Sequence, residues 1–231
     1  MRSFTKQFNA LILFVTALIM LTGFTFANLC IATPYEDCVN RLKDRLQCTQ
    51  RTAEDLFLKI NYLADGIQEK LVYVASSTDS TSSKEEMIDE IIQEYFTSEN
   101  STIQVSSLRR TSIYDYTITD YTIDDYLHRL ANLKDELGYA KVDLMFEPSY
   151  LGIGAVEKTD DFSYEISISM WQSFVGWIED SIGYDDATRK KFRLSFDLKD
   201  NKISNIRIDE IAVAETIELE RFKRRLKNER E

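Results

Sequence analysis

The sequence predicts an α+β roll, in which a curved antiparallel sheet wraps around helices, preceded by a long N-terminal helix or helical hairpin. Apolar residues repeat at helical spacing before residue 138 and at alternate positions after it, which orders helices before long strands. A short strand pattern around Ile103 and Val105 separates two of these helical segments. The 231 residues are 44% hydrophobic with only 7 Gly and 2 Pro, which excludes collagen-like and broadly disordered chains.

Residues 1–27 have the features of a secretory signal peptide. Arg2 and Lys6 precede an apolar run from Ala10 to Phe26, and small residues at 25 and 27 suit cleavage after Ala27. A membrane-spanning helix needs about 20 apolar residues, so an uncleaved anchor is the alternative. We predict an exported protein, in the periplasm or cell envelope of a bacterial host. It would touch the membrane only through residues 10–27, and only if these are not removed.

Three cysteines follow the predicted signal peptide. Cys38 and Cys48 fall on one predicted helix, where ten residues rise about 15 Å, too far for a disulfide. Cys30 can fold back to pair with Cys38, which leaves Cys48 for a bond between molecules. The alternative is that all three are small apolar helix residues. Clustered thiols without a nearby histidine lack zinc-site spacing, so we expect no metal.

Residues 28–76 form the predicted helical N-terminal region. Thr33, Pro34 and Glu36 give a capped helix start, and an apolar stripe follows from Val39 to Val74. Weak points near Ala53 and at Gly66 leave a single helix, a kinked helix or a hairpin open. The stripe either packs on its own domain or forms a coiled coil with a second copy. Residues 77–83 are a polar linker.

Residues 84–214 form the predicted roll. Its helices cover 84–97 and 123–137, and Gly138 ends the second of them. Strands are predicted at 139–147, 162–177, 190–199 and 202–214, and slips in the alternating pattern indicate bulges in the last. Residues 215–231 are a charged C-terminal helix with apolar residues on one side.

This order of elements resembles the nuclear-transport-factor-two-like (cystatin-like cone) superfamily. The chain is similar to exported bacterial proteins that contain a domain of this type. The resemblance covers residues 84–214 and includes a closing hairpin, Phe196 to Ile203 followed by Ile206 to Ile211. It implies a conical cavity, which members use in steroid isomerases and dehydratases, in ligand binding, or only as a scaffold for dimers. Those enzymes rely on Asp/Tyr or His/Asp sets, and no motif here matches such a set residue by residue.

Few reaction classes fit the remaining residues. His128 is the single histidine, which excludes two-histidine zinc motifs, and we expect it at a solvated position on its helix. Gly152 and Gly154 lack the third glycine of a dinucleotide-binding loop. The aspartate pairs, including Asp185–Asp186, are expected at caps and turns. A net charge of −11 argues against nucleic-acid binding.

Two sets of aromatic and apolar residues are the candidate functional positions. Tyr95, Tyr126, Phe146 and Met170 are the candidates for a cavity lining, against the alternative of a filled core. Trp171, Phe174 and Trp177 are the candidates for an exposed surface that meets a partner.

The sequence thus favours a non-enzymatic binding or scaffold module of the cell envelope, without a cofactor, that meets a protein partner or itself. One alternative is a small-ligand binder or enzyme that uses the conical cavity, and another is the outer part of a membrane-anchored assembly. A polar cavity that encloses two or more carboxylates or tyrosines would favour ligand binding.

Overall fold

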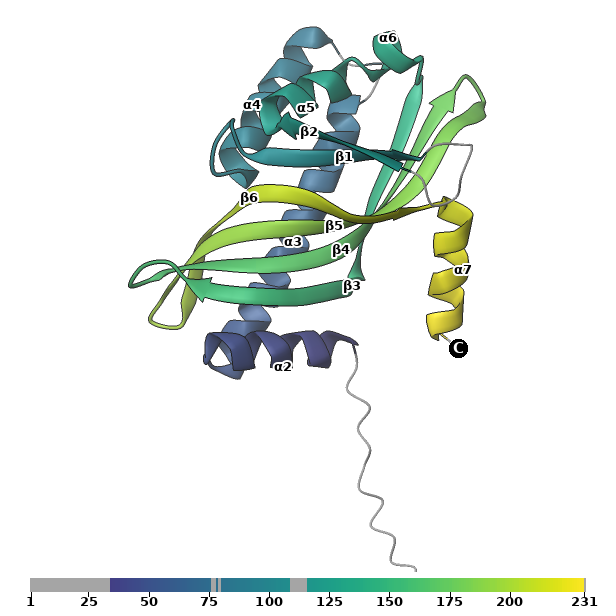
Figure 1. Cartoon of the computed structure of the whole chain (residues 1–231). Coiled ribbons are helices and arrows are strands. Elements are labelled where there is room, and N and C mark those ends of the chain that lie inside the picture. Colours follow the sequence, from purple (N-terminus) through teal and green to yellow (C-terminus); the bar gives the residue numbers. More distant parts are fainter. Residues whose placement is uncertain (1–33, 76–77, 79, 109–115, 231) are drawn as a thin grey trace, which may run out of the picture. The chain divides into compact units, whose positions relative to one another are not determined.

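A computed structural model describes residues 34–75, 78, 80–108 and 116–230 of the chain (Figure 1). The predicted signal peptide, Cys30 and parts of the predicted linker lie outside these residues. The described helices are α2 (Pro34–Leu46), α3 (Gln50–Ala75), α4 (Thr81–Tyr95), α5 (Ile123–Ala131), α6 (Leu133–Leu137) and α7 (Leu219–Arg230). The strands are β1 (Thr102–Leu108), β2 (Tyr116–Thr122), β3 (Lys141–Lys158), β4 (Ser163–Ile178), β5 (Ser181–Lys199) and β6 (Lys202–Ile217).

The six strands form one curved sheet in the order β2-β1-β6-β5-β4-β3. Neighbouring strands are antiparallel, except that β1 runs parallel to β6 where Thr102 and Ile103 pair with Glu210 and Ile211. The register shifts in β3–β4, β4–β5 and β5–β6, and bulges of this kind bend long strands. The two slips predicted in the last strand are confirmed as shifts in β6.

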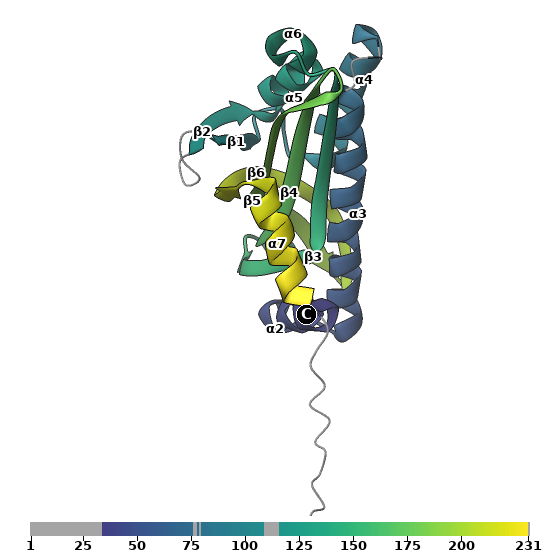
Figure 2. The same ribbon diagram turned by 90° about the vertical axis from the view of Figure 1, so that its right-hand side faces the viewer.

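The helices lie against this sheet, with α3 running along it and α4 and α5 near one end of α3 (Figure 2). The main core joins buried residues of α2 to α5 to those of the sheet, such as Leu42, Ile60, Ile91, Leu127 and Leu194. This arrangement is the predicted α+β roll. Among the described residues, no helix has both the length and the apolar character needed to cross a membrane.

The predicted N-terminal helical region consists of two helices at an angle (Figure 1). The chain turns at Gln47, where φ is 50°, and the Thr49 hydroxyl accepts a hydrogen bond from the Thr52 amide at the start of α3. Gly66 does not interrupt α3. The predicted apolar stripe is buried in the main core of its own domain.

Several predicted boundaries moved. The first helix of the roll begins at Thr81, where Ser80 caps it. The second is divided at Asn132 into α5 and α6 and ends, as predicted, at Gly138, where φ is 75°. Strand β2 was not predicted, and β6 continues to Ile217.

A second, smaller apolar cluster joins Trp171 to Leu219 and Phe222 of α7.

Candidate functional site

A cavity of about 140 Å³ lies between the sheet and the helices α5 and α6. Strands β1, β4 and β5 and the two helices contribute its walls, which include apolar side chains of Val105, Leu130, Leu133 and Phe174. Hydroxyl, carboxyl and amino groups interrupt this apolar lining. The cavity therefore combines a water-excluding wall with a small number of groups that can hydrogen-bond.

Strand β5 supplies most of the polar groups. Side chains alternate along a strand, so the even-numbered residues from 184 to 196 share the face that looks into the roll. This face is apolar at Phe192, Leu194 and Phe196, which belong to the core. Toward the N-terminal end of β5 the same face is polar. Its residues there all line the cavity: Tyr184, Asp186, Thr188 and Lys190.

The prediction that Asp186 lies at a cap or turn is therefore wrong. Asp186 lies inside β5 and is only 4% exposed. The Tyr184 hydroxyl donates a 2.7 Å hydrogen bond to Asp186 Oδ2 and accepts one of 2.9 Å from the Leu108 amide. Burial raises the pKa of Asp186 to about 6, although the Tyr184 hydrogen bond and the charge of Lys190 lower it. Burial also raises the pKa of Tyr184, so its hydroxyl stays protonated.

Lys190 brings a buried amino group to the same cavity. It is 5% exposed, and its Nζ donates a 2.6 Å hydrogen bond to the Gln104 carbonyl oxygen. The Gln104 side chain is itself held, because it donates to Asp120 Oδ1 and accepts from the Val213 amide. Burial lowers the pKa of Lys190 to about 8, and the charge of Asp186 opposes this shift.

Further polar groups of the lining come from β1 and α5. Ser106, Thr188 and Thr216 form a buried hydroxyl cluster, with oxygen–oxygen distances of 2.7 to 3.4 Å. Tyr126 lines the cavity from α5, and burial raises its pKa to about 12. Within the described part of the chain, no hydrogen bond reaches its hydroxyl. Arg129 lies beside it in the cavity wall, with its guanidinium 5.5 Å from the centre of the Tyr121 ring.

Of the four residues predicted to line a cavity, Tyr126 and Phe146 do so and Tyr95 and Met170 do not. Tyr126 lines the cavity, and together with Phe146 it also lines an adjoining hollow of about 10 Å³. Met170 is 1% exposed and belongs to the filled core. Tyr95 lies outside the cavity, with its ring against Gly66 of α3 and Lys70 5.3 Å from the ring centre.

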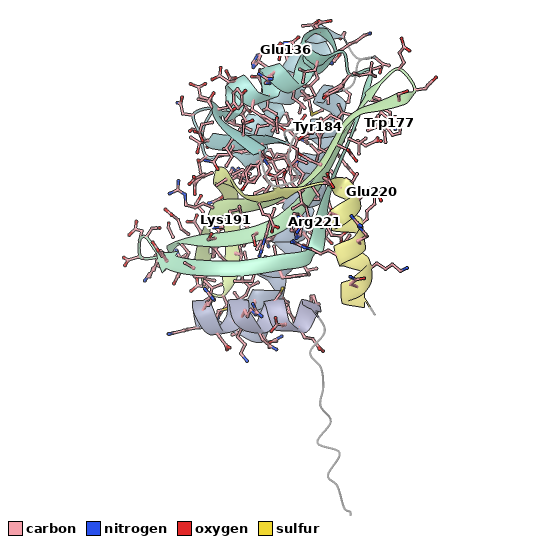
Figure 3. The ribbon with its side chains drawn as sticks, turned by 45° about the vertical axis from the view of Figure 1, so that its right-hand side comes forward. Glu136, Trp177, Tyr184, Lys191, Glu220 and Arg221 are labelled. Atoms are coloured by element: carbon pink, nitrogen blue, oxygen red, sulfur yellow. The ribbon has the colours of Figure 1, made fainter. Side chains whose placement is uncertain are left out.

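The three residues predicted to form one exposed aromatic surface do not lie together. Trp171 is 7% exposed because α7 covers it, with the Phe222 ring 4.9 Å away. Phe174 lines the cavity. Trp177 lies near the β4–β5 turn, where its Nε1 donates to Asp143 Oδ2 at 2.8 Å (Figure 3). The strand alternation sends Trp171 and Phe174 to opposite faces of β4.

Cys38 and His128 have structural partners. The Cys38 thiol is buried and donates to the Leu151 carbonyl oxygen at 3.2 Å, and burial raises its pKa. The predicted pairing with Cys30 concerns a residue outside the described part. His128 is half exposed on α5, where it lies 3.1 Å from Glu85 Oε2 of α4. These contacts connect elements and take no part in the cavity.

The polar cavity residues of β5 were not predicted, although the sequence pattern indicates them. The alternation seen in Phe192, Leu194 and Phe196 continues upstream through Lys190, Thr188, Asp186 and Tyr184 without a break. The predicted strand began only at residue 190, because the residues before it on the same face are polar. Extending the strand by its period would have put a carboxyl, a phenol and an amine on the inner face.

No protein-family model matches the sequence, and no curated protein is similar to it. Solved structures similar to this chain include a protein from Novosphingobium aromaticivorans assigned as a scytalone dehydratase, at 9% identity and a TM-score of 0.40. That match covers 74% of this chain and 91% of that one. An NTF-2 like protein of unknown function from Shewanella oneidensis matches at 11% identity over 67% and 94% of the two chains, with a TM-score of 0.27.

The fold is identified from this chain's own structure. The evidence is the order of the strands in the sheet and the position of the helices on the inner side of the sheet. Among the described residues, five helices and two short strands precede four long antiparallel strands, and the curved sheet closes over a hydrophobic core with a cavity at one end. The chain therefore has the nuclear-transport-factor-two-like, or cystatin-like cone, fold.

Proposed function

We propose that this protein binds a small organic ligand in the cavity between β5 and α5. The observation that carries the proposal is the hydrogen-bonded Tyr184–Asp186 pair, which lies with the Lys190 amine in a space of about 140 Å³ with partly apolar walls. Burying charged groups costs stability, and such groups with shifted pKa values gather at functional sites. A scaffold with a filled interior would have no use for them.

The volume and the groups suggest the kind of ligand. A protein cavity of about 150 Å³ holds benzene, whereas sites for drug-sized ligands span about 300–1,000 Å³. The ligand is therefore a single ring or a short branched chain. With a pKa of about 6, Asp186 is mostly ionised at neutral pH and can accept a hydrogen bond from a ligand hydroxyl. The Tyr126 hydroxyl and the Lys190 amine can donate to a ligand oxygen.

A specific observation also favours a second candidate, an acid–base enzyme. A carboxyl group with a pKa near the working pH is suited to take and return a proton, and Asp186 is such a group. The envelope scaffold favoured by the sequence has less support, because three tyrosines and a carboxylate surround the cavity. Export remains part of the proposal and rests on residues 1–27.

A binding screen with a filled-cavity variant tests the proposal. We expect ring-sized alcohols, phenols and ketones to shift amide NMR signals of β5 and to raise the melting temperature of the full chain. Val105→Phe places extra atoms in the cavity wall and should abolish both effects. Ile118→Phe is the matched control, because Ile118 is exposed on β2 and lies outside the cavity lining. Binding that survives Val105→Phe, or a screen without any bound compound, would contradict the proposal.

A further inference from the structure

Lys190 has the surroundings of a reactive amine. Its side chain lines both the main cavity and the adjoining hollow, so it lies where the two spaces meet. Its Nζ has one hydrogen bond, to the Gln104 carbonyl oxygen, and within the described residues no carboxylate oxygen lies within 4 Å of it. Lys84 is also buried, but its Nζ donates to the Ala131 carbonyl oxygen outside the cavity. Burial in a ligand cavity therefore distinguishes Lys190 from Lys84.

The charged and titratable groups around Lys190 come from two sides of the cavity. From β5 come Asp186 and Tyr184, and from the helical side come Tyr126, Arg129 and Tyr139. Asp186 favours the charged ammonium, whereas burial favours the neutral amine and has the larger effect. The neutral amine, which is the nucleophilic form, is therefore accessible near neutral pH.

We propose that Lys190 forms an imine with the carbonyl group of a small aldehyde or ketone held in the cavity. This inference rests on the proposed function, because it requires that a ligand occupy the cavity. The substrate class is a carbonyl compound of about the size of one ring, and Lys190 becomes a site of reversible covalent attachment.

The reaction balances without an oxidant or reductant. The Nζ lone pair forms the nitrogen–carbon bond, the carbonyl π electrons move to oxygen, and a proton passes from nitrogen to that oxygen to give a carbinolamine. The hydroxyl then takes a proton from an acid and leaves as water, while the nitrogen lone pair forms the carbon–nitrogen double bond. Asp186 lies on the same face of β5 and, with a pKa of about 6, is suited to supply that proton. The protonated imine keeps one N–H, which can still donate to the Gln104 carbonyl oxygen.

Reductive trapping tests this step. The full chain is incubated with benzaldehyde or cyclohexanone and sodium cyanoborohydride, which converts an imine into a stable secondary amine, and the modified peptide is identified by mass spectrometry. Lys191 is the matched control, because it is the next residue and is exposed on the opposite face of β5 (Figure 3). We expect Lys190 to be modified at least about tenfold faster than Lys191 at pH 7, since each unit by which a pKa is lowered gives about tenfold more neutral amine.

Two variants make the result specific. Lys190→Met should abolish the modification, with circular dichroism to confirm that the variant is folded. Asp186→Asn removes the negative charge that holds the ammonium, so the pH midpoint of Lys190 modification should fall below its wild-type value of about 8. A purely structural lysine would show neither the fast modification nor the shifted midpoint. Equal modification of Lys190 and Lys191, or an unshifted midpoint, would overturn the proposal.

A non-covalent probe separates the two proposals. Benzyl alcohol has the shape of benzaldehyde but cannot form an imine, and it is added to the same protein. If benzyl alcohol binds in the cavity and benzaldehyde does not modify Lys190, the imine is excluded and the ligand site stands. If benzyl alcohol does not bind and Lys190 is not modified, both proposals fail.

Discussion

At the scale of single residues, Lys190 and Asp186 carry charges where an apolar residue would stabilise the fold more. Both lie on the strand face that continues the core of Phe192 and Leu194, and both are almost fully buried. Their shifted pKa values measure that cost, because a group whose charged form is disfavoured in the folded state reduces stability at pH 7. Residues of this kind are typical of sites where stability has been given up for function.

Replacing Lys190 by methionine should therefore stabilise the protein. A pKa lowered from 10.5 to about 8 corresponds to about 3 kcal/mol at pH 7, and the lost hydrogen bond to Gln104 offsets about 1 kcal/mol. We expect the free energy of unfolding of Lys190→Met to exceed that of the wild type by about 2 kcal/mol, measured by urea denaturation.

The stability difference between Lys190→Met and the wild type should also depend on pH. Between pH 8 and pH 10.5 the unfolded chain binds more protons at this lysine than the folded chain does, so wild-type stability rises with pH. The variant has no such group, and its advantage should shrink across this range. A Lys190→Met protein that is less stable than the wild type at pH 7 would indicate a structural role for the amine.

At the scale of elements, α3 shows how a tertiary contact fixes a residue inside a helix. Glycine in a helix interior costs about 1 kcal/mol relative to alanine, yet Gly66 lies in the middle of α3. A Cβ atom at Gly66 would lie 2.5 Å from the Tyr95 hydroxyl oxygen of α4. The glycine therefore allows α3 and α4 to approach each other, and α3 continues through it without a break.

The pair Gly66 and Tyr95 can be tested by a double-mutant cycle. Gly66→Ala should destabilise the wild type by about 1 kcal/mol or more, because the clash outweighs the better helix propensity. In a Tyr95→Phe background the nearest atom is the ring carbon at 3.3 Å, so the same substitution should be close to neutral or stabilising. Thermal unfolding of the four proteins measures the coupling. Equal effects of Gly66→Ala in both backgrounds would exclude the contact as the reason for glycine.

At the scale of the whole molecule, the described residues from Pro34 onward form one compact unit. The stripes on α2 and α3 complete the core of the roll, so the N-terminal helical region is part of the domain and not an appendage. Export to a space outside the cytosol stays a prediction, which rests on the sequence pattern of residues 1–27.

Maturation of the chain tests this prediction. We expect export of the full-length protein to be followed by cleavage after Ala27, so that the mature chain starts at Asn28. Intact-mass measurement of the protein from the envelope fraction gives the new N-terminus directly. Ala27→Leu puts a large residue at the cleavage position and should leave the precursor uncut, whereas Ala32→Leu lies beyond it and should be processed normally. A chain that keeps Met1 would indicate an anchor instead.

Much of the fold was readable because local chemistry determined it. Gly138 ended a helix, and the alternation of Phe192 to Phe196 marked a strand, each through contacts within a few residues. Strand β2 could not be read, because its residues are mostly exposed and it is held by pairing with β1. Trp171 was placed on the surface because α7, which covers it, lies about 50 residues later in the chain.

The sequence by itself determined the class of fold, the order of helices and long strands, and the polar character of the β5 face. Whether that face met water or was enclosed was decided only when α5 and α6 packed across it. The pKa of Asp186 and the reactivity we infer for Lys190 depend on this enclosure, since the same side chains in water would have ordinary acid–base behaviour. The chemical identity of a group is a property of its residue, whereas its solvation depends on segments far away in the sequence.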